Sequence, residues 1–413
     1  MKMVLIFMTT TCLLLVGLVT LLVMHLFFNP TSRISEQKLA SMRQQGLVPE
    51  EKTTATTQRS GTASFTFTGV GDNLLHDTIF VYYEQDHNTR DYSPIYQFTN
   101  KYTQNTDLAY VNVETVCAGD EYGLSSYPLF NGPLEMLDTL SRSGFDWMSL
   151  CSNHSLDAGE EGLQTEIQYL RTHHPEITTS GAYLNEAQSN SPSVKVVNGI
   201  RVGLASFTYG LNGVTLPSEE EWMIDVYRKE DGSINYDLIQ QRINALNSIS
   251  DVQIVSMHWG EEYSTHPTTE QTELAQYLSQ LGVEVIIGSH PHVIQPVEWI
   301  LTSDQSTLVY YSLGNFISAQ NMAETMVGGM AQFQINYNFD TQEVTFEKVQ
   351  FIPTVTCISS DLRTYRTTTL AEYSEGLEAD HYITVSGEDL SKTWIEQYVQ
   401  SILKNPKGVE VVL

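Results

Sequence analysis

Short apolar segments of this sequence repeatedly end in side chains that can bind a metal ion. Five of these segments have the length and apolar character of β-strands: 64–70, 108–113, 145–150, 252–257 and 283–287. The polar residues that follow them are, in order, Asp72, Glu114, Asn153 with His154, His258, and His290 with His292. Loops that leave the carboxyl ends of parallel strands meet at one edge of a sheet, so we expect these side chains to lie close together.

Each of these residues has an ordinary explanation when it is considered alone. An Asp after a strand often forms a turn or caps a helix, and Asn153 could be a turn residue. The joint pattern is different, because a simple core has no reason to place such side chains at five strand ends. Carboxylate, amide and imidazole ligands together suit Mn, Fe or Zn, and the lack of a nearby Cys argues against a structural zinc. The sequence therefore predicts a site for one or two divalent transition-metal ions.

The elements that must position this site alternate along the chain. Amphipathic helical segments at 134–143, 160–172, 236–249 and 268–281 lie between several of the strands, which predicts a largely parallel sheet covered by helices. Two strand pairs look antiparallel instead: one turns at Asn198-Gly199 and the other, 330–339 with 343–351, turns at Asp340-Thr341. We therefore predict a mixed-sheet α/β sandwich. Residues from 354 onward are less patterned and end in a predicted helix at 390–403.

The N-terminal segment 3–28 contains no Asp, Glu, Lys or Arg and is long enough to cross a bilayer as one helix. A cleaved signal peptide is the alternative, although its apolar core is usually shorter. We predict a transmembrane anchor at 1–28, a polar juxtamembrane stalk at 29–63, a folded domain at 64–353 and a C-terminal extension at 354–413. A very short head before an apolar segment favours an extracytoplasmic domain in a single-pass membrane protein, whereas Arg33, Lys38 and Arg43 after it argue for the opposite orientation.

The charge of the chain limits its partners. The formal net charge is −28, so nucleic acid is excluded as a partner because phosphate contacts need Lys and Arg. An anionic polymer would also be repelled except where local cations intervene. Cys117, Cys151 and Cys357 remain outside the apolar segment, an odd number without framework spacing, so one disulfide could form among them and the sequence does not say which.

The motifs around these residues resemble the CapA family of poly-γ-glutamate capsule biosynthesis proteins, within the calcineurin-like metallophosphoesterase superfamily. The resemblance covers roughly residues 65–353 and implies a fold of the metallophosphoesterase type. It rests on Gly71-Asp72, Asn112-Val113-Glu114, the run from Ser152 to Gly159, His258-Trp259-Gly260-Glu261-Glu262-Tyr263, the run from Gly288 to Pro296, and Tyr311-Ser312-Leu313-Gly314-Asn315-Phe316.

The resemblance also implies a role for each ligand. Asp72 would bind one metal ion and Glu114 would bridge two. The second ion would be held by Asn153, His258 and His290, and His292 would return to the first. His154 would lie beside the substrate and orient or protonate a leaving oxygen, while the ions activate water and stabilise charge on the electrophile.

Two departures from the superfamily pattern affect the first ion. The superfamily begins with Asp-x-His, but Leu74 occupies that His position here, and His76 lies two residues further on. The second superfamily motif, Gly-Asp-x-x-Asp, is replaced by the segment that ends in Glu114. The first ion would keep only Asp72, Glu114 and His292, so a one-metal site is an alternative.

Several neighbouring residues have two interpretations. Trp259, Tyr263 and Tyr311 could line a substrate groove or pack at the rim of the strands. Either Glu261 or Glu262 could accept a hydrogen bond from a ligand His, or both could be solvated charges. Asp157 is expected to support the site structurally by capping the helix that starts near residue 160.

Three functions are compatible with the sequence. The first is a component of cell-surface polymer production that cuts, transfers or attaches poly-γ-glutamate or a related polymer, and the motifs favour it. The second is an extracellular metal-dependent phosphoesterase, which the missing Asp-x-His histidine disfavours. The third is a non-catalytic scaffold subunit of a membrane polymer synthase. The expected partners are thus the membrane, an anionic cell-surface polymer and synthase subunits.

Overall fold

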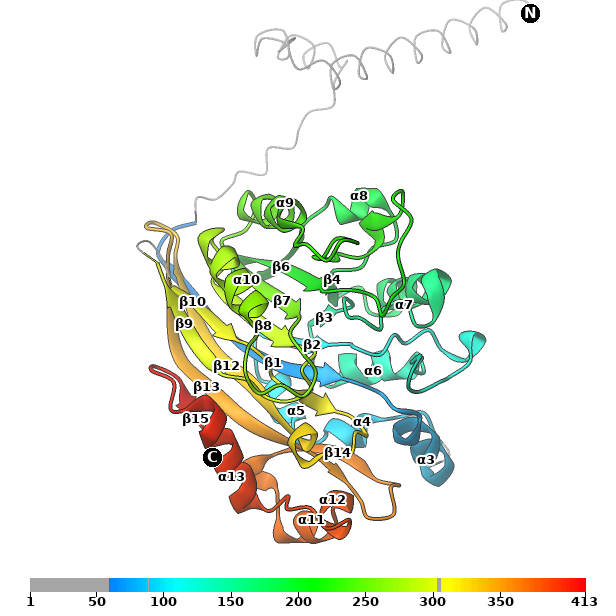
Figure 1. Ribbon diagram of the computed structural model, residues 1–413. Coiled ribbons are helices and arrows are strands. Elements are labelled where there is room, and N and C mark those ends of the chain that lie inside the picture. Colours follow the sequence, from blue (N-terminus) through cyan, green and yellow to red (C-terminus); the bar gives the residue numbers. More distant parts are fainter. Residues whose placement is uncertain (1–58, 88, 303–305) are drawn as a thin grey trace, which may run out of the picture. The chain divides into compact units, whose positions relative to one another are not determined.

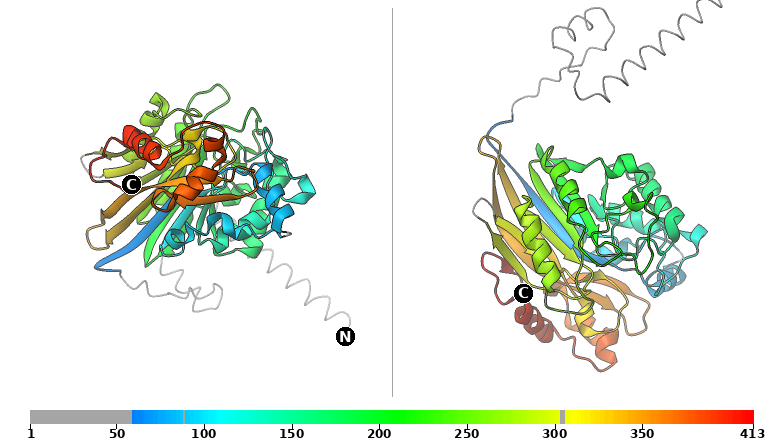
Figure 2. Two further views of the ribbon diagram at one scale, coloured as in Figure 1. Left: turned by 90° about the horizontal axis from the view of Figure 1, so that it is seen from below. Right: turned by 45° about the horizontal axis from the view of Figure 1, so that its top comes forward.

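The computed structural model describes residues 59–87, 89–302 and 306–413, which form two mixed β-sheets with helices around them (Figures 1 and 2). The first sheet has the strand order β14-β13-β12-β1-β2-β3-β4, with β11 beside β1 and β15 beside β13. Its strands are β1 (Thr62–Asn73), β2 (Leu108–Asn112), β3 (Trp147–Ser149), β4 (Thr178–Ser180), β11 (Asn315–Ile317), β12 (Val327–Asn338), β13 (Glu343–Ile358), β14 (Tyr365–Thr369) and β15 (Glu410–Val411).

The second sheet has the strand order β5-β6-β7-β8-β10-β9. Its strands are β5 (Ser193–Val197), β6 (Ile200–Thr208), β7 (Val252–His258), β8 (Val285–Ser289), β9 (Val297–Leu301) and β10 (Ser306–Tyr310). In both sheets the central strands are parallel: β1 to β4 in the first, and β6, β7, β8 and β10 in the second. The antiparallel pairs β5–β6 and β12–β13 occur where the sequence predicted hairpins, so the mixed α/β class is confirmed.

Helices correspond to all four helical segments predicted within the domain. These are α6 (Glu135–Arg142), α7 (Gly159–His173), α9 (Tyr236–Asn247) and α10 (Thr269–Gln280). Helix α10 begins with a capping box, in which Thr268 and Gln271 satisfy each other's backbone N–H groups. The other α-helices of the described residues are α3 (Asp77–His87), α4 (Ser93–Tyr96), α5 (Asn100–Thr103), α8 (Glu186–Ser189), α11 (Glu375–Asp380), α12 (Tyr382–Val385) and α13 (Lys392–Leu403).

The core has two layers because the central strands of the second sheet are buried on both faces. On β6, Leu204 belongs to a large cluster shared with the first sheet, whereas its neighbour Ala205 belongs to a cluster shared with α9 and α10. Successive residues of a strand point to opposite faces, so this alternation places the second sheet between the first sheet and these two helices. The hydroxyl groups of Tyr110 and Ser256 lie 2.6 Å apart and join the sheets.

The two ends of the chain relate differently to the predicted boundaries. Residues 1–58, with the predicted anchor and most of the predicted stalk, lie outside the described residues. None of the helices in the described ranges is long and apolar enough to span a membrane. At the other end, residue 354 lies inside β13, and the extension adds β14 and β15 to the first sheet, with α13 beside them (Figures 1 and 2). Cys117, Cys151 and Cys357 are free and buried.

A close backbone approach fixes the end of β1. The backbone N–H of Asp72 donates to the carbonyl oxygen of Gly314, at 2.9 Å. A Cβ atom on Gly71 would lie only 1.8 Å from that same oxygen, so no larger residue fits. The lack of a side chain at Gly71 therefore allows the segment that carries Asp72 to lie directly against the segment before β11, where the hydrogen bond holds it.

We expect Gly71→Ala to lower the free energy of unfolding by at least about 2 kcal/mol, because backbone at this contact must move to admit the methyl group. Gly210→Ala is the matched control, since nothing lies within 4 Å of the position its Cβ would occupy. Chemical denaturation of both variants measures the difference. Equal stability of Gly71→Ala and the wild type would contradict the close approach.

Candidate metal centre

The six predicted ligands meet at the carboxyl ends of the parallel strands of both sheets. Asp72 is the last residue but one of β1, His258 ends β7, and His290 follows β8 directly. Donor atoms of these residues form two groups in which all members lie within 4.8 Å of one another: Glu114 with His258 and His290, and Glu114 with Asp72 and His292. Glu114 belongs to both groups, which is the position that a bridging ligand would take.

Asn153 completes the first of these groups. Its Oδ1 lies 2.8 Å from Nε2 of His258, and that nitrogen lies 3.7 Å from Oε1 of Glu114. On the other side of the imidazole ring, Nδ1 of His258 lies 3.0 Å from Oγ of Ser289. In the tautomer that donates from Nδ1 to Ser289, Nε2 has a free lone pair for a metal ion.

The second group is built around His292. Its Nδ1 lies 3.1 Å from Oδ1 of Asn315 and 3.4 Å from Oδ2 of Asp72, while Nε2 lies 3.8 Å from Oε1 of Glu114. The amide nitrogen of Asn315 is used by other acceptors, so its oxygen faces the histidine. Oδ1 of Asp72 accepts from the amide of Asn112, at 2.9 Å. These contacts fix the orientation of both ligands.

The chemistry of the donors fits a divalent cation. Both carboxylate oxygens of Glu114 and Nδ1 of His290 are buried without a hydrogen-bond partner, and such atoms are costly unless something else binds them. Burial and the nearby Asp72 raise the pKa of Glu114 well above its usual range. A cation between these groups would reverse this effect by stabilising the ionised carboxylate.

The three histidines differ in their protonation. Burial, together with neighbouring histidines, lowers the pKa of His258 and of His290 well below the usual value. Both are therefore neutral at physiological pH, which is the form that binds metal ions. Burial would lower the pKa of His292 as well, but the carboxylates of Glu114 and Asp72 outweigh it and raise that pKa to about 9. In the absence of a metal ion, His292 acts as the countercharge of the two carboxylates.

His154 lies beside the ligand groups and is held by Asp157. Its Nδ1 lies 2.6 Å from Oδ2 of Asp157, and its ring packs edge-on against Phe130 with 4.8 Å between ring centroids. The same carboxylate oxygen accepts from the backbone N–H of Phe130. The prediction that Asp157 caps the following helix is wrong: α7 has Ala158 at its N-cap and no side-chain cap. The Asp157 carboxylate instead orients the imidazole ring.

The departures from the superfamily pattern are visible in the structure. Leu74 is a buried core residue whose backbone N–H donates to Ile317. Nδ1 of His76 accepts from the backbone N–H of Ala319, and burial lowers the pKa of His76 to about 4. Neither residue belongs to a ligand group, so the second group keeps the three ligands that the sequence left to it.

The aromatic residues of the motifs have different positions. Trp259 and Tyr311 are fully buried, and the indole N–H of Trp259 donates to the carbonyl oxygen of Tyr311, so both are core residues rather than a groove lining. Tyr263 is 46 % exposed, and its ring centroid lies 6.0 Å from that of His292. Glu261 and Glu262 are both exposed, and the charge of Glu262 is close enough to contribute to the raised pKa values of Glu114 and His292.

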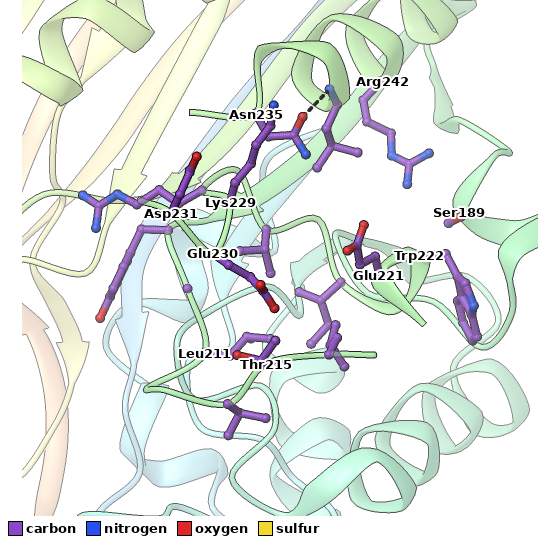
Figure 3. Close-up of a pocket in the computed structure, with 18 of the residues that line it drawn as sticks. Ser189, Leu211, Thr215, Glu221, Trp222, Lys229, Glu230, Asp231, Asn235 and Arg242 are labelled. Atoms are coloured by element: carbon purple, nitrogen blue, oxygen red, sulfur yellow. Dashed lines mark hydrogen bonds between the residues drawn. The ribbon is translucent and has the colours of Figure 1, made fainter. Parts of the chain in front are cut away.

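A cavity of about 930 Å³ borders the centre and was not predicted from the sequence (Figure 3). It is lined by the loop after β6 and by residues of α9, and it shares Tyr209 and Asn212 with the centre. The ring of Tyr209 lies 4.6 Å from that of His290. Figure 3 shows the carboxylates of Glu221 and Glu230 pointing into the cavity. The strand end at β6 is followed by Tyr209 and not by an Asp, Glu or His that could have drawn attention to this loop.

The fold and the site together define a mixed α/β protein with a buried cluster of histidines and carboxylates that could hold metal ions. A family model described as "Bacterial capsule synthesis protein PGA_cap" matches residues 66–320, and the chain belongs to this family. The predicted CapA resemblance is thereby confirmed.

Curated relatives carry names from the same process. The chain is 27% identical over 214 residues to the PGA biosynthesis protein CapA of Bacillus subtilis, which covers 49% of this chain and 50% of that protein. It is 26% identical over 208 residues to the capsule biosynthesis protein CapA of Bacillus anthracis, covering 49% of this chain and 47% of the relative. The chain spans about half the length of the curated relatives it matches. Among solved structures, a novel phosphatase from Mycoplasma pneumoniae aligns at 14% identity with a TM-score of 0.42, over 71% of this chain and 94% of that one.

We expect the purified full-length chain to contain about one or two equivalents of a divalent transition metal, and His290→Ala to lower that content, because His290 supplies an unpaired buried donor. Removal of the metal with a chelator should lower the melting temperature, since a ligand that binds only the folded state stabilises it. Elemental analysis and thermal unfolding measure both effects.

His173→Ala is the control for that experiment, because His173 is an exposed histidine of α7 whose imidazole hydrogen-bonds to and stacks on Tyr169 of the same helix, and it belongs to neither ligand group. It should keep the metal content of the wild type. A wild-type chain that contains no metal, and whose melting temperature does not respond to chelator or added metal, would contradict the metal centre.

Proposed function

We propose that this chain is a membrane-anchored protein of capsule production that processes a poly-γ-glutamate-type polymer at its metal centre, by cleaving, transferring or attaching it. Membership of the capsule synthesis family supports the process. The observation that carries the chemical part is the pair of ligand groups that share the buried carboxylate of Glu114, whose oxygens have no hydrogen-bond partner. A site that served only to hold a scaffold together would not need two overlapping groups beside a positioned histidine.

The ligand groups suggest how the centre would work. Asp72, Glu114 and His292 would hold one ion, and Glu114, His258 and His290, with Asn153 beside them, would hold the other. Bound there, divalent ions would polarise the substrate and lower the pKa of water so that it can attack at neutral pH. A fold of the metallophosphoesterase type, which the motifs imply, is compatible with this ligand arrangement.

His154 is the residue we assign to proton transfer. Its Nδ1 is engaged by Asp157, which leaves Nε2 for the substrate, and the edge-on contact with Phe130 restricts rotation of the ring. A histidine fixed in this way can protonate a leaving group in the transition state. It adjoins the ligand groups without belonging to either of them, so its role is separable from metal binding.

The charges around the cavity indicate how an anionic polymer could approach. Two of the three cations that line the cavity are already in ion pairs, Arg228 with Glu270 and Arg242 with the buried Asp225. With a net charge of −28, the chain offers the carboxylates of a polymer little other positive potential. We therefore assign the recognition of polymer carboxylates to the metal ions themselves, with the half-exposed Tyr263 at the rim.

Proposed catalysis is tested with His154→Ala, Asp72→Asn and Glu114→Gln in cells that make the polymer and with purified protein supplied with Mn or Zn. The His154→Ala variant should turn over substrate at least about 100-fold more slowly, and should still bind metal, because the substitution removes the proton donor and no metal ligand. Asp72→Asn and Glu114→Gln should lose metal and turnover together. His173→Ala is again the matched control, with normal metal and turnover.

The substrates for this assay separate the competing functions. Poly-γ-glutamate and generic phosphoesters are offered side by side, and turnover of the polymer alone is the expected result. Turnover of phosphoesters alone would mean that the substrate is a phosphoester and not the polymer. If neither is turned over but surface polymer still requires the ligand set, the chain acts by binding or assembly, and normal polymer in all three variants would overturn the catalytic proposal.

The proposed location is tested by adding protease to intact cells or protoplasts. The segment 3–28, free of charged residues, is proposed as the anchor, with the domain outside the membrane and beside polymer-synthase subunits. Protease should therefore remove the domain and leave a short membrane-bound fragment, as seen with an antibody to each end. A cytoplasmic marker protein should survive the same treatment, and full protection of the domain would contradict the orientation.

A further inference from the structure

A side chain from the cavity loop contacts the metal centre at two points. Asn212 lies in the loop that follows β6, and its backbone has the positive φ that Asn tolerates better than most residues. Its Oδ1 accepts from Nδ2 of Asn153 at 3.0 Å, and its own Nδ2 lies 3.2 Å from Nδ1 of His154. One exposed asparagine therefore touches both a candidate metal ligand and the candidate proton donor.

The contact with Asn153 decides which end of that amide faces the centre. The Oδ1 of Asn153 points toward His258, as a metal-binding oxygen must, so its NH₂ group points away from the ligand groups. That NH₂ group finds its acceptor in Asn212. The torsion that exchanges the two ends of an amide is soft. Asn153 also hydrogen-bonds to Tyr209, but a tyrosine hydroxyl can donate as well as accept and does not select one end of the amide, whereas the oxygen of Asn212 accepts only and so selects the NH₂ end. An NH₂ group turned toward a cation would repel it.

We propose that Asn212 is a positioning residue of the metal centre, which raises metal affinity by fixing the amide of Asn153 with its oxygen toward the ions. The inference goes beyond the proposed function, because it concerns metal binding and holds whichever reaction the centre performs. The loop at residues 209–216 therefore lies between the metal centre and the 930 Å³ cavity, since Asn212 lines the cavity and also contacts the centre.

The surroundings of Asn212 separate positioning from a structural role. Asn212 and its neighbours Gly213 and Val214 are exposed, so this part of the loop adds little to the core, whereas Leu211 and Leu216 on either side are buried in it. Asn212→Gly removes the side chain and leaves a residue that adopts positive φ without strain. Asn212→Asp keeps an acceptor oxygen for Asn153, whereas Thr215→Asp adds the same charge elsewhere on the loop.

The test measures the affinity of the full-length chain for Zn²⁺ and Co²⁺ by competition with a chelator, together with the visible absorption of the Co²⁺ form. Asn212→Gly should weaken metal binding about 10- to 100-fold and alter the Co²⁺ spectrum, as loss of an outer contact to a metal ligand does. Asn212→Asp should restore affinity to within a few-fold of the wild type. The double variant Asn212→Gly with Thr215→Asp should stay weak, because it restores the charge and not the acceptor. Melting temperatures of the metal-free proteins should agree.

Each other outcome overturns the proposal. Wild-type affinity in Asn212→Gly would mean that Asn153 does not need Asn212 to hold its orientation, and equal recovery in the double variant would mean that charge alone matters. A wild-type chain that binds neither ion would leave Asn212 with nothing to position. The polymer turnover assay can fail without affecting these affinity measurements, so the proposed function and this inference are judged separately.

Discussion

The burial of the Glu114 carboxylate is the constraint on which the arrangement of the site depends. Burying an ionised carboxylate whose two oxygens accept no hydrogen bond lowers the stability of the folded protein, and this free-energy penalty can be reduced in only a few ways. Protonation is one, and the raised pKa of Glu114 shows that tendency in the metal-free chain. The positive charge of His292 is another. Neither supplies contacts to both oxygens, whereas two divalent ions on either side of the carboxylate would.

The ligands can converge on Glu114 because one short segment joins the ends of the two sheets. The residues from Tyr311 to Asn315 run between β8 of the second sheet and β1 of the first. Leu313 donates its backbone N–H to Gly288, and Gly314 accepts from Asp72. Cβ atoms on Gly71 or Gly288 would lie within 2 Å of carbonyl oxygens of this segment, so both glycines are required for its close approach. The segment then ends in Asn315, which orients His292.

Most of the strands and all six candidate ligands could be predicted from the sequence, because the end of each apolar segment can be located from the polar residues that follow it. Apolar segments ending in Asp72, Glu114 or His258 identify both the strands and the direction in which their loops leave. The antiparallel additions were also predictable, since Asn198-Gly199 is a strong hairpin signal. Most of the ligands that were predicted are Asp, Glu or His, residue types that commonly bind metal ions, and Asn153 was predicted because it adjoins His154 at a strand end.

The residues that were missed share a different property. Asn112, Asn315 and Asn212 act through hydrogen bonds to ligands, and an uncharged Asn in a strand or loop carries no signal of that role. Asn112 and Asn315 lie within recognisable motifs, so their position could have suggested them. Asn212 lies 59 residues from its partner Asn153, and only the pairing of β6 with β7 brings its loop to the site.

The two ligand groups are unequal, and the difference follows from how many donors are free. In the group with Asp72, the carboxylate already accepts from Asn112 and from the backbone of His290, and the histidine that the superfamily would add is absent. In the group with His258, Nδ1 of His290 is unpaired and Asn153 adds an amide oxygen. An ion at the group with His258 therefore gains more free donors. The shared carboxylate of Glu114 then also favours an ion at the group with Asp72, because a carboxylate ionised by one cation is already in the form that a second cation binds.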